Sequence, residues 1–456
     1  MKVLSMNRGF GAALLLGLVA ASSAPALSST VPAQPLDLKG AVELAVEKSP
    51  ALGVAAKAVT SRELDYSNAV AAFLPSVDFA TTVGPQGPQQ TGSGALANQL
   101  NLTLSESLYD NHTSIIRLAV AKRQREFAHL TLQQTRDDLT VQIATAYFRY
   151  SASQAQAEIR ETQLSTLRKE FRSLSDQYNQ GLKTRRDYIR LQTQLQRAEL
   201  DLIAAKNTVA QNSTELRRVI GLDAESPVEF TPVSTERARS FSPILPEKSA
   251  SVDQTYERSL ADLQNEVNTR DIELAQRKYW PVVNVNGQIT YQKSDYLEPL
   301  LPTGTGYVTP ALTPWNWNAL LTVQYNILDW GTRRRNIELA RVQTDSKWDQ
   351  LRAGLLSTDA RIRSTWLDLK QLERSFKLDQ ELLKIEEETY GILQVEYREG
   401  RAAYLDLITE LNNLLDAKSR LYTSYFDLQT RLVTYRYFER GAYESIVSSK
   451  GGTHGR

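Results

Sequence analysis

The chain contains one sequence signature twice, and the spacing between the two copies is constant. The segment Tyr178 to Asp187 returns as the segment Tyr397 to Asp406, with Tyr, Gly and Asp at matching positions. The offset between these segments also relates four further pairs of identical residues: Asp110 and Asp329, Thr113 and Thr332, Ala121 and Ala340, and Ile143 and Ile362. A single offset that holds from Asp110 to Asp187 indicates two copies of one structural unit.

The N-terminus has the pattern of a secretory signal peptide. Lys2 and Arg8 flank the start of an apolar run from Phe10 to Ala21, which is too short to span a bilayer. Residues 24–26 read Ala-Pro-Ala, a typical cleavage site, so residues 1–26 are expected to be removed. No later segment has the long uninterrupted apolar run of a membrane-spanning helix. The mature chain is therefore expected to be exported, and either soluble outside the cytoplasm or inserted as a β-barrel.

Composition argues against nucleic-acid binding and against catalysis. There are 53 basic and 52 acidic residues, without the basic excess of nucleic-acid-binding proteins. The sequence has no Cys, which excludes disulfides, thiolate metal sites, Cys nucleophiles and an N-terminal lipid-modified Cys. His112, His129 and His454 have no metal-ligand spacing, and no phosphate-binding loop or nucleophile motif is present. We expect no enzyme activity, no cofactor and no metal site.

Proline placement divides the chain. No Pro occurs between Gln89 and Ser226 or after Pro314, and a Pro-rich stretch lies between these two regions. The resulting segments are a first repeat at 27–231, a connector at 232–250, a second repeat at 251–440 and a flexible tail at 441–456.

Each Pro-free region predicts a very long amphipathic helix. Residues 114–178 contain neither Gly nor Pro and carry apolar side chains at helical spacing. About 65 residues in a helix span roughly 100 Å, and a helix of that length requires lateral packing, as in a coiled coil. Its counterpart covers about 336–396. Four helices of about half this length or less are also predicted: 51–73, 188–220, 252–279 and 405–438. The long helices and the half-helices that follow them form two hairpins, at about 112–220 and 332–438.

Two strand pairs are predicted where the short helices end, at about 75–108 and 281–328, with connecting loops at about 84–96 and 292–316. Apolar and polar residues alternate with period two, as in Leu100-Asn101-Leu102-Thr103-Leu104-Ser105. The runs have about the length of a tilted membrane strand, and the polar positions are mostly uncharged. An antiparallel sheet packed on a soluble core would give the same alternation. A cluster of aromatic residues typical of a membrane interface favours the membrane: Tyr291, Tyr296, Tyr307, Trp315 and Trp317.

Four strands are too few to close a barrel, since the smallest membrane barrels have about eight. An open sheet would leave unpaired backbone groups in lipid, where they cannot be satisfied. The chain is therefore expected to oligomerise, with each protomer contributing four strands. Three copies would give twelve strands.

The order of elements, together with three motifs, resembles the TolC family of outer-membrane efflux and secretion ducts. The motifs are the paired Tyr-x-x-Gly-x5-Asp turns, the opening segment Leu36 to Pro50, and the strand-to-helix junction Leu328 to Arg333. The resemblance covers essentially the whole mature chain. It implies a mixed α and β membrane protein: a homotrimer with a twelve-stranded barrel in the outer membrane of a Gram-negative-type bacterium, continued by a coiled-coil tunnel in the periplasm. The implied partners are outer-membrane lipid, a periplasmic adaptor and an inner-membrane pump. The implied function is efflux or type I secretion, and the substrate is not identified.

The resemblance also implies roles at the periplasmic tip. Asp406 matches a carboxylate that points into a closed aperture, where three symmetry-related copies would attract cations. The family's second ring carboxylate is Thr409 here, and its basic residue after the turn glycine is Ala402, so a weaker ring is expected. Tyr397 and Asp187 match residues that tie the inner hairpin, from the second repeat, to the outer hairpin, from the first.

The turns themselves are candidates for contact with the adaptor, at Gly181, Leu182, Gly400 and Arg401. From the residues alone, both tip aspartates also fit solvated carboxylates favoured by the dipole at a helix N-terminus.

Two rival functions stay open. A soluble exported scaffold or adaptor without a pore would need no detergent. A specific porin with added helices would show ordinary porin conductance and no partner.

Overall fold

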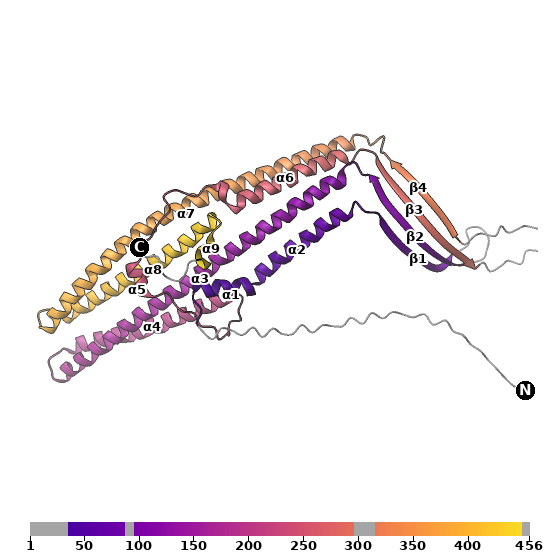
Figure 1. The fold of residues 1–456 in the computed structure, drawn as a ribbon. Helices are drawn as coiled ribbons and strands as arrows, with labels where there is room; N and C mark the ends of the chain where they lie inside the picture. Colours follow the sequence, from indigo (N-terminus) through magenta and orange to yellow (C-terminus); the bar gives the residue numbers. More distant parts are fainter. Residues whose placement is uncertain (1–34, 87–94, 296–314, 449–456) are drawn as a thin grey trace, which may run out of the picture.

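The computed structural model describes residues 35–86, 95–295 and 315–448. The predicted signal peptide, Tyr296 and Tyr307 lie outside the described residues. The described chain forms a long helical body with a four-stranded sheet at one end (Figure 1). The strands are β1 Ser76–Gln86, β2 Ala95–Tyr109, β3 Val282–Asp295 and β4 Trp315–Gln324. The helices are α1 Leu38–Lys48, α2 Pro50–Ala71, α3 Thr113–Asn179, α4 Arg185–Ile220, α5 Thr235–Ser240, α6 Tyr256–Arg277, α7 Thr332–Arg398, α8 Tyr404–Phe438 and α9 Ala442–Val447, with a 3-10 turn at Val252–Gln254.

The two long helices form the frame of the helical body. α3 and α7 each have 67 residues, and the offset of the repeated signature relates both their first and their last residues. The shorter helices α2 and α4 follow each other along α3, and α6 and α8 follow each other along α7 (Figure 1). Contacts of α3 with α6 and α8 join the two halves. The order across the layer is therefore α2 and α4, α3, α6 and α8, and then α7.

The sheet continues this layer. Its order is β1-β2-β3-β4, and every neighbouring pair is antiparallel. β1 follows α2 and β4 precedes α7, so the edge strands adjoin the edge helices (Figure 1). One protomer thus has two continuous edges. The first consists of β1, α2 and α4, and the second of β4 and α7.

The passage from strand to long helix has the same geometry in both halves. Asn111 and His112 have φ of 65° and 64°, and their counterparts in the second repeat, Trp330 and Gly331, have φ of 53° and 79°. Asp110 then accepts a hydrogen bond from the backbone N–H of Ser114 (2.6 Å). Asp329 accepts the equivalent bond from Arg333 (2.9 Å). A carboxylate that caps free N–H groups fixes the start of each helix, and hence its direction relative to the sheet.

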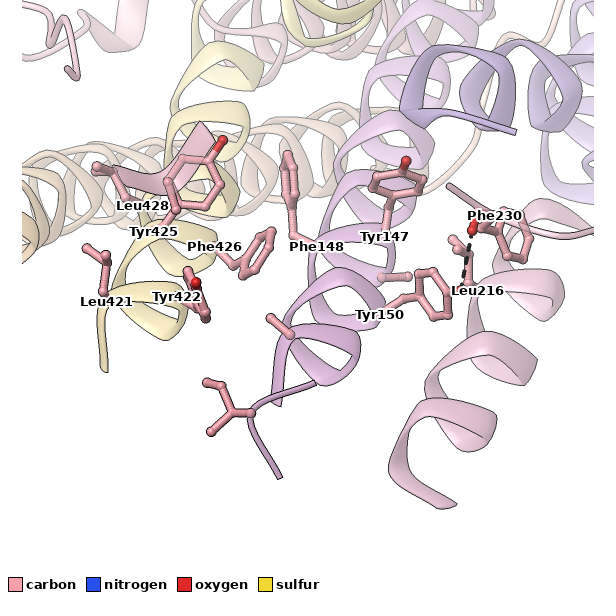
Figure 2. Close-up of a cluster of buried hydrophobic side chains, with 14 of the residues drawn as sticks. Tyr147, Phe148, Tyr150, Leu216, Phe230, Leu421, Tyr422, Tyr425, Phe426 and Leu428 are labelled. Atoms are coloured by element: carbon pink, nitrogen blue, oxygen red, sulfur yellow. Dashed lines mark hydrogen bonds between the residues drawn. The ribbon is translucent and has the colours of Figure 1, made fainter. Parts of the chain in front are cut away.

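Aromatic side chains fill the core where the two halves meet (Figure 2). The rings of Phe148 on α3 and Phe426 on α8 lie 6.3 Å apart. On the other side of α3, Tyr150 packs edge-on against Phe230 at 5.9 Å and donates a hydrogen bond to its carbonyl oxygen (3.3 Å). The backbone of Leu36 pairs with the same segment. The start of the described chain and the segment before the connector are thus held against the middle of the helical body.

The segment predicted as a flexible tail begins differently, with helix α9. Ala442 is fully buried, and the backbone N–H of Tyr443 donates to the carboxylate of Asp137 (3.2 Å). Asp137 is only 1% exposed and also accepts a bond from the Tyr256 hydroxyl (3.0 Å). A buried carboxylate needs hydrogen-bond donors, and those of Asp137 come from residues that are distant in the sequence. The hydrophobic periodicity of the sequence therefore could not predict this contact.

Two other predicted bounds differ from the structure. β4 ends at Gln324 rather than about 328, and the predicted helix 252–279 is divided at Thr255.

Asp138→Asn is expected to stabilise the protein at neutral and alkaline pH. Burial, followed by the negative charge of Glu257, raises the pKa of Asp138 from an ordinary 3.8 to about 6. The folded state therefore binds this proton more tightly than the unfolded chain, and the free energy of unfolding rises as pH falls through about 6. The amide removes the charge and should add about 1 kcal/mol at about pH 8, after allowance for partial exposure.

The measurement is the urea midpoint of the detergent-solubilised protein at about pH 8 and about pH 5. The advantage of the variant should shrink at the lower pH, because wild-type Asp138 is then largely protonated. Asp201→Asn, at an exposed position on α4, is the control and should move neither midpoint. An Asp138→Asn variant less stable than wild type at both pH values would contradict this reading of the cluster.

Candidate functional site

The sheet has one apolar face and one polar face. The strand register places Phe79, Leu102 and Ile289 side by side, and the next such row holds Val77, Leu104 and Gly287. These apolar side chains are exposed in the protomer: Val77 64%, Phe79 67%, Leu102 43% and Ile289 46%. Apolar rows that run across neighbouring strands and face outward are expected where lipid, not protein, covers them.

The opposite face is polar and mostly uncharged. Asn101 lies at its centre, and its side-chain oxygen accepts hydrogen bonds from Gln99 (3.1 Å), Gln288 (3.4 Å) and Thr290 (2.9 Å). Thr103 continues this face between Asp78 and Gln288. Amide and hydroxyl groups bonded across neighbouring strands suit a surface in contact with water inside a membrane wall.

Aromatic residues occur at both ends of the sheet. Tyr291 and Trp315 are paired at the end remote from the helices, with ring centroids 4.9 Å apart, and Trp317 is 80% exposed. Trp315 lies within β4, not in the predicted loop. At the helical end, Trp280 and Trp330 are 59% and 82% exposed, and sequence reasoning missed this second group. Two aromatic belts that bracket an apolar band are typical of a membrane-spanning sheet.

The turn glycines end the long helices at the far tip of the molecule. Gly181 and Gly400 have φ of 77° and 76°, a left-handed conformation that glycine adopts without strain. The N–H of Leu182 then bonds to the carbonyl of Gln177, and the N–H of Arg401 to that of Glu396, both at 2.8 Å. Leu182 is 68% exposed, as a residue available to a partner must be. Arg401 forms an ion pair with Glu399.

The two tip aspartates have different surroundings. The Thr184 hydroxyl donates to the Asp187 carboxylate (2.7 Å) and accepts from the Asp187 N–H (3.2 Å). The hydrogen bond to the carboxylate lowers the pKa of Asp187. In the second hairpin the corresponding cap residue is Ala403, which has no side-chain oxygen. The Asp406 carboxylate is exposed and makes no hydrogen bond or ion pair within the described ranges. Asp187 thus has a hydrogen-bond partner at its own helix start, whereas Asp406 has no such partner among the described residues.

The two residues predicted to tie the hairpins together lie near each other but are not bonded. Tyr397 and Asp187 line one cavity between the two hairpins, but no hydrogen bond joins them among the described residues. Tyr397 and Tyr404 instead lie near Glu170 of α3, and burial together with that carboxylate raises the pKa of both tyrosines. Sequence reasoning missed Glu170, because nothing local connects it with tyrosines in the other hairpin.

A second carboxylate does lie near Asp406. The Thr409 hydroxyl donates to the Leu405 carbonyl of its own helix (2.9 Å) and offers no charge. Glu410, one turn after Asp406, approaches Glu386 of α7, and the hydrogen bond between the two raises the pKa of Glu386. The family pattern pointed to position 409, and Glu410 beside it was therefore missed.

The edges of the helical layer each carry an exposed apolar stripe. The α7 stripe consists of five side chains that are 56–66% exposed: Leu356, Leu367, Leu378, Ile385 and Ile392. Their positions are separated by close to three or close to two helical turns, so they share one side of the helix, opposite the buried Phe376. The α4 stripe consists of Ile189, Leu200 and Ile203, which are 48–66% exposed. It lies opposite the buried Leu191.

The described part of the chain contains neither a membrane-spanning helix nor a candidate metal site. None of its helices combines the length and the apolar character that crossing a membrane requires. Within the same residue ranges, no group of His, Asp and Glu side chains could hold a metal ion.

The fold and its faces define a class: a protein that joins a membrane sheet to a helical body roughly 100 Å long. The sequence model of the family "Outer membrane efflux protein" matches residues 41–222 and 259–434, and the chain belongs to this family. It is therefore an outer-membrane efflux channel that extends into the periplasm.

Known proteins agree with this assignment. Protein CyaE of Bordetella pertussis is 21% identical over 429 residues, which cover 90% of this chain and 86% of that protein. The outer membrane protein VceC of Vibrio cholerae has the same fold, with a TM-score of 0.71 at 16% identity over 88% of this chain and 96% of that one. The CmeC outer membrane channel of Campylobacter jejuni gives a TM-score of 0.73 at 14% identity over 90% and 88%.

Proposed function

We propose that three copies of the chain form one closed duct. The main support for this proposal is that both edges of the protomer have unpaired strands and exposed apolar side chains. β1 and β4 each lack a neighbouring strand on one side among the described residues, and the α4 and α7 stripes are exposed. Contact between the first edge of one copy and the second edge of the next is head-to-tail, and such contacts close into a ring when the rotation permits. Closure satisfies the edge strands in lipid, where unpaired backbone groups are not tolerated.

The number three comes from the resemblance to the TolC family, and it gives a barrel of twelve strands. The matched lengths of α3 and α7, together with the constant offset between them, support two structural repeats within each protomer. The polar face around Asn101 would line the barrel, and the apolar face around Leu102 would meet lipid. The helices would continue the duct through the periplasm, toward an adaptor and an inner-membrane pump that dock at the tip. This role fits drug or metal efflux and type I secretion equally.

The aperture is proposed to lie at the first turn of α8. Asp406 has no competing contact among the described residues, and Glu410 follows it by one helical turn. In a trimer these side chains form acidic rings that attract cations and narrow the passage. Tyr397 and Asp187 would hold the inner hairpin against the outer one when the aperture is closed. Thr409 contributes size but no charge.

Single-channel conductance in a planar bilayer tests this assignment. Wild-type protein should show a small, cation-selective conductance. Asp406→Ala should enlarge the conductance or reduce the selectivity, because each substitution removes three ring charges in the trimer. Thr409→Asp adds a carboxylate on the same helix and should increase cation selectivity. A large conductance that neither variant alters would keep the channel but remove the aperture from this site. Failure of the wild-type protein to insert would favour the soluble scaffold.

A further inference from the structure

The two hairpins form a cavity at the tip, and Tyr397 and Asp187 are part of its lining. Its volume is about 630 Å³, and its walls come from the ends of α3, α4, α7 and α8. Because both hairpins contribute to it, any molecule held there contacts the outer and the inner hairpin together.

The lining carries an excess of positive charge. Lys183, Arg186 and Arg190 come from the outer hairpin and Arg398 from the inner one, and none of the four forms an ion pair within the described ranges. Asp187 is the one carboxylate in the described lining, so the four cations exceed the acidic charge there by three. Like charges gathered in a concave site repel one another and strengthen the local potential, which favours an anionic ligand.

One further hydrogen-bond donor at the cavity lacks an acceptor. The N-terminal turn of α8 opens onto it, and the cap residue Ala403 supplies no side-chain acceptor. The Tyr404 hydroxyl is buried and has no hydrogen-bond partner among the described residues. Buried polar groups in folded proteins are normally satisfied, so the Tyr404 hydroxyl adds to the charge as a second indication of a missing acceptor.

We propose that this cavity binds carboxylate side chains from an acidic segment of the protein that docks on the tip. The inference rests on the proposed function, because it concerns the partner of that duct. A protein segment fits better than a small ion for two reasons. The cations are spread over two hairpins and at least one helical turn of α4. Leu405 in the lining is 43% exposed, and Leu182, next to Lys183 in the sequence, is 68% exposed; a small anion would leave both uncovered.

The test is fluorescence anisotropy of a labelled hexaglutamate peptide with the purified detergent-solubilised protein at low salt. The triple variant Lys183→Gln, Arg186→Gln, Arg190→Gln should weaken binding about tenfold or more, because it removes three charge-assisted contacts. A matched triple variant, Lys169→Gln, Arg197→Gln, Lys206→Gln, removes the same charge from helix positions outside the cavity and should bind as wild type. Circular dichroism checks that both variants are folded.

Equal binding by wild type and the cavity variant would overturn the proposal, as would equal losses in the two triple variants. Displacement of the peptide by inorganic phosphate at millimolar concentration, but not by chloride at the same ionic strength, would assign the site to a small anion instead. Conductance of the same wild-type preparation separates this inference from the proposed function. Conductance without peptide binding refutes only the cavity assignment, and peptide binding without conductance refutes only the duct.

Discussion

Leu102→Arg is expected to prevent stable insertion into the outer membrane. Leu102 lies between Phe79 and Ile289 on the apolar face, at the middle of β2, so the guanidinium would enter lipid. A charge at the middle of a membrane strand costs about 2–4 kcal/mol, and a trimer would incur that cost three times. The measurement is the amount of protein retained in urea-washed outer membranes, followed by unfolding of the refolded protein from lipid vesicles.

Thr103→Arg is the matched control, one residue away on the polar face. There the new charge lies opposite Asp78 and in contact with water, so insertion should be close to wild type. If both substitutions were tolerated equally, the apolar face would not be in lipid. The reverse pattern, with Thr103→Arg excluded and Leu102→Arg retained, would mean that the two faces had been assigned the wrong way round.

The double variant Leu378→Glu, Ile385→Glu should convert the trimer into monomers. Both side chains belong to the α7 stripe and are 64% and 59% exposed in the protomer. In the closed ring they would be buried against the α4 stripe of the next copy. Burying two carboxylates per interface without partners costs several kcal/mol, and the two substitutions also remove the apolar contact of both side chains. Light scattering after size-exclusion chromatography in detergent gives the oligomeric state.

Lys384→Glu is the control for this prediction. It reverses a charge beside Ile385, but on a different side of the helix, and the trimer should persist. A double variant that stays trimeric would show that α7 is not at the interface between copies. Dissociation by Lys384→Glu alone would show that the interface is polar and uses another side of α7.

The long helices could be predicted from local sequence because particular residues define where they start and end. Gly181 and Gly400 supply the left-handed turn, and Asp110 and Asp329 cap the next helix start, so the predicted bounds of α3 agree with the structure to within a single position at each end. The strands could be predicted from the alternation of apolar and polar residues. The strand register of the structure then aligns apolar residues with apolar ones, and polar with polar, across the sheet. The aromatic group at the helical end of the sheet escaped notice because its members come from separate segments.

The tip shows where local reasoning stops. The turn residues and Asp406 could be located from the repeated signature. The cavity could not, because Lys183 and Arg398 lie in different hairpins, which meet through tertiary contacts such as those of α3 with α8. The position of Glu170 near Tyr397 and Tyr404, and the contact of Asp137 with α9, likewise join residues that are far apart in the sequence. A buried carboxylate has no sequence pattern of its own, and its partners are set by tertiary packing.

The central claim is that the polar face of the sheet lines a water-filled pore while the apolar face meets lipid. The chain has no native Cys, so single Cys variants report without background. The decisive measurement is single-channel current through Thr103→Cys and Leu102→Cys during addition of a charged, water-soluble thiol reagent. Current through the Thr103→Cys channel should fall in up to three steps, one for each copy, while current through the Leu102→Cys channel should be unaffected. Block of the Leu102→Cys channel with no effect at Thr103→Cys would contradict this assignment of the two faces.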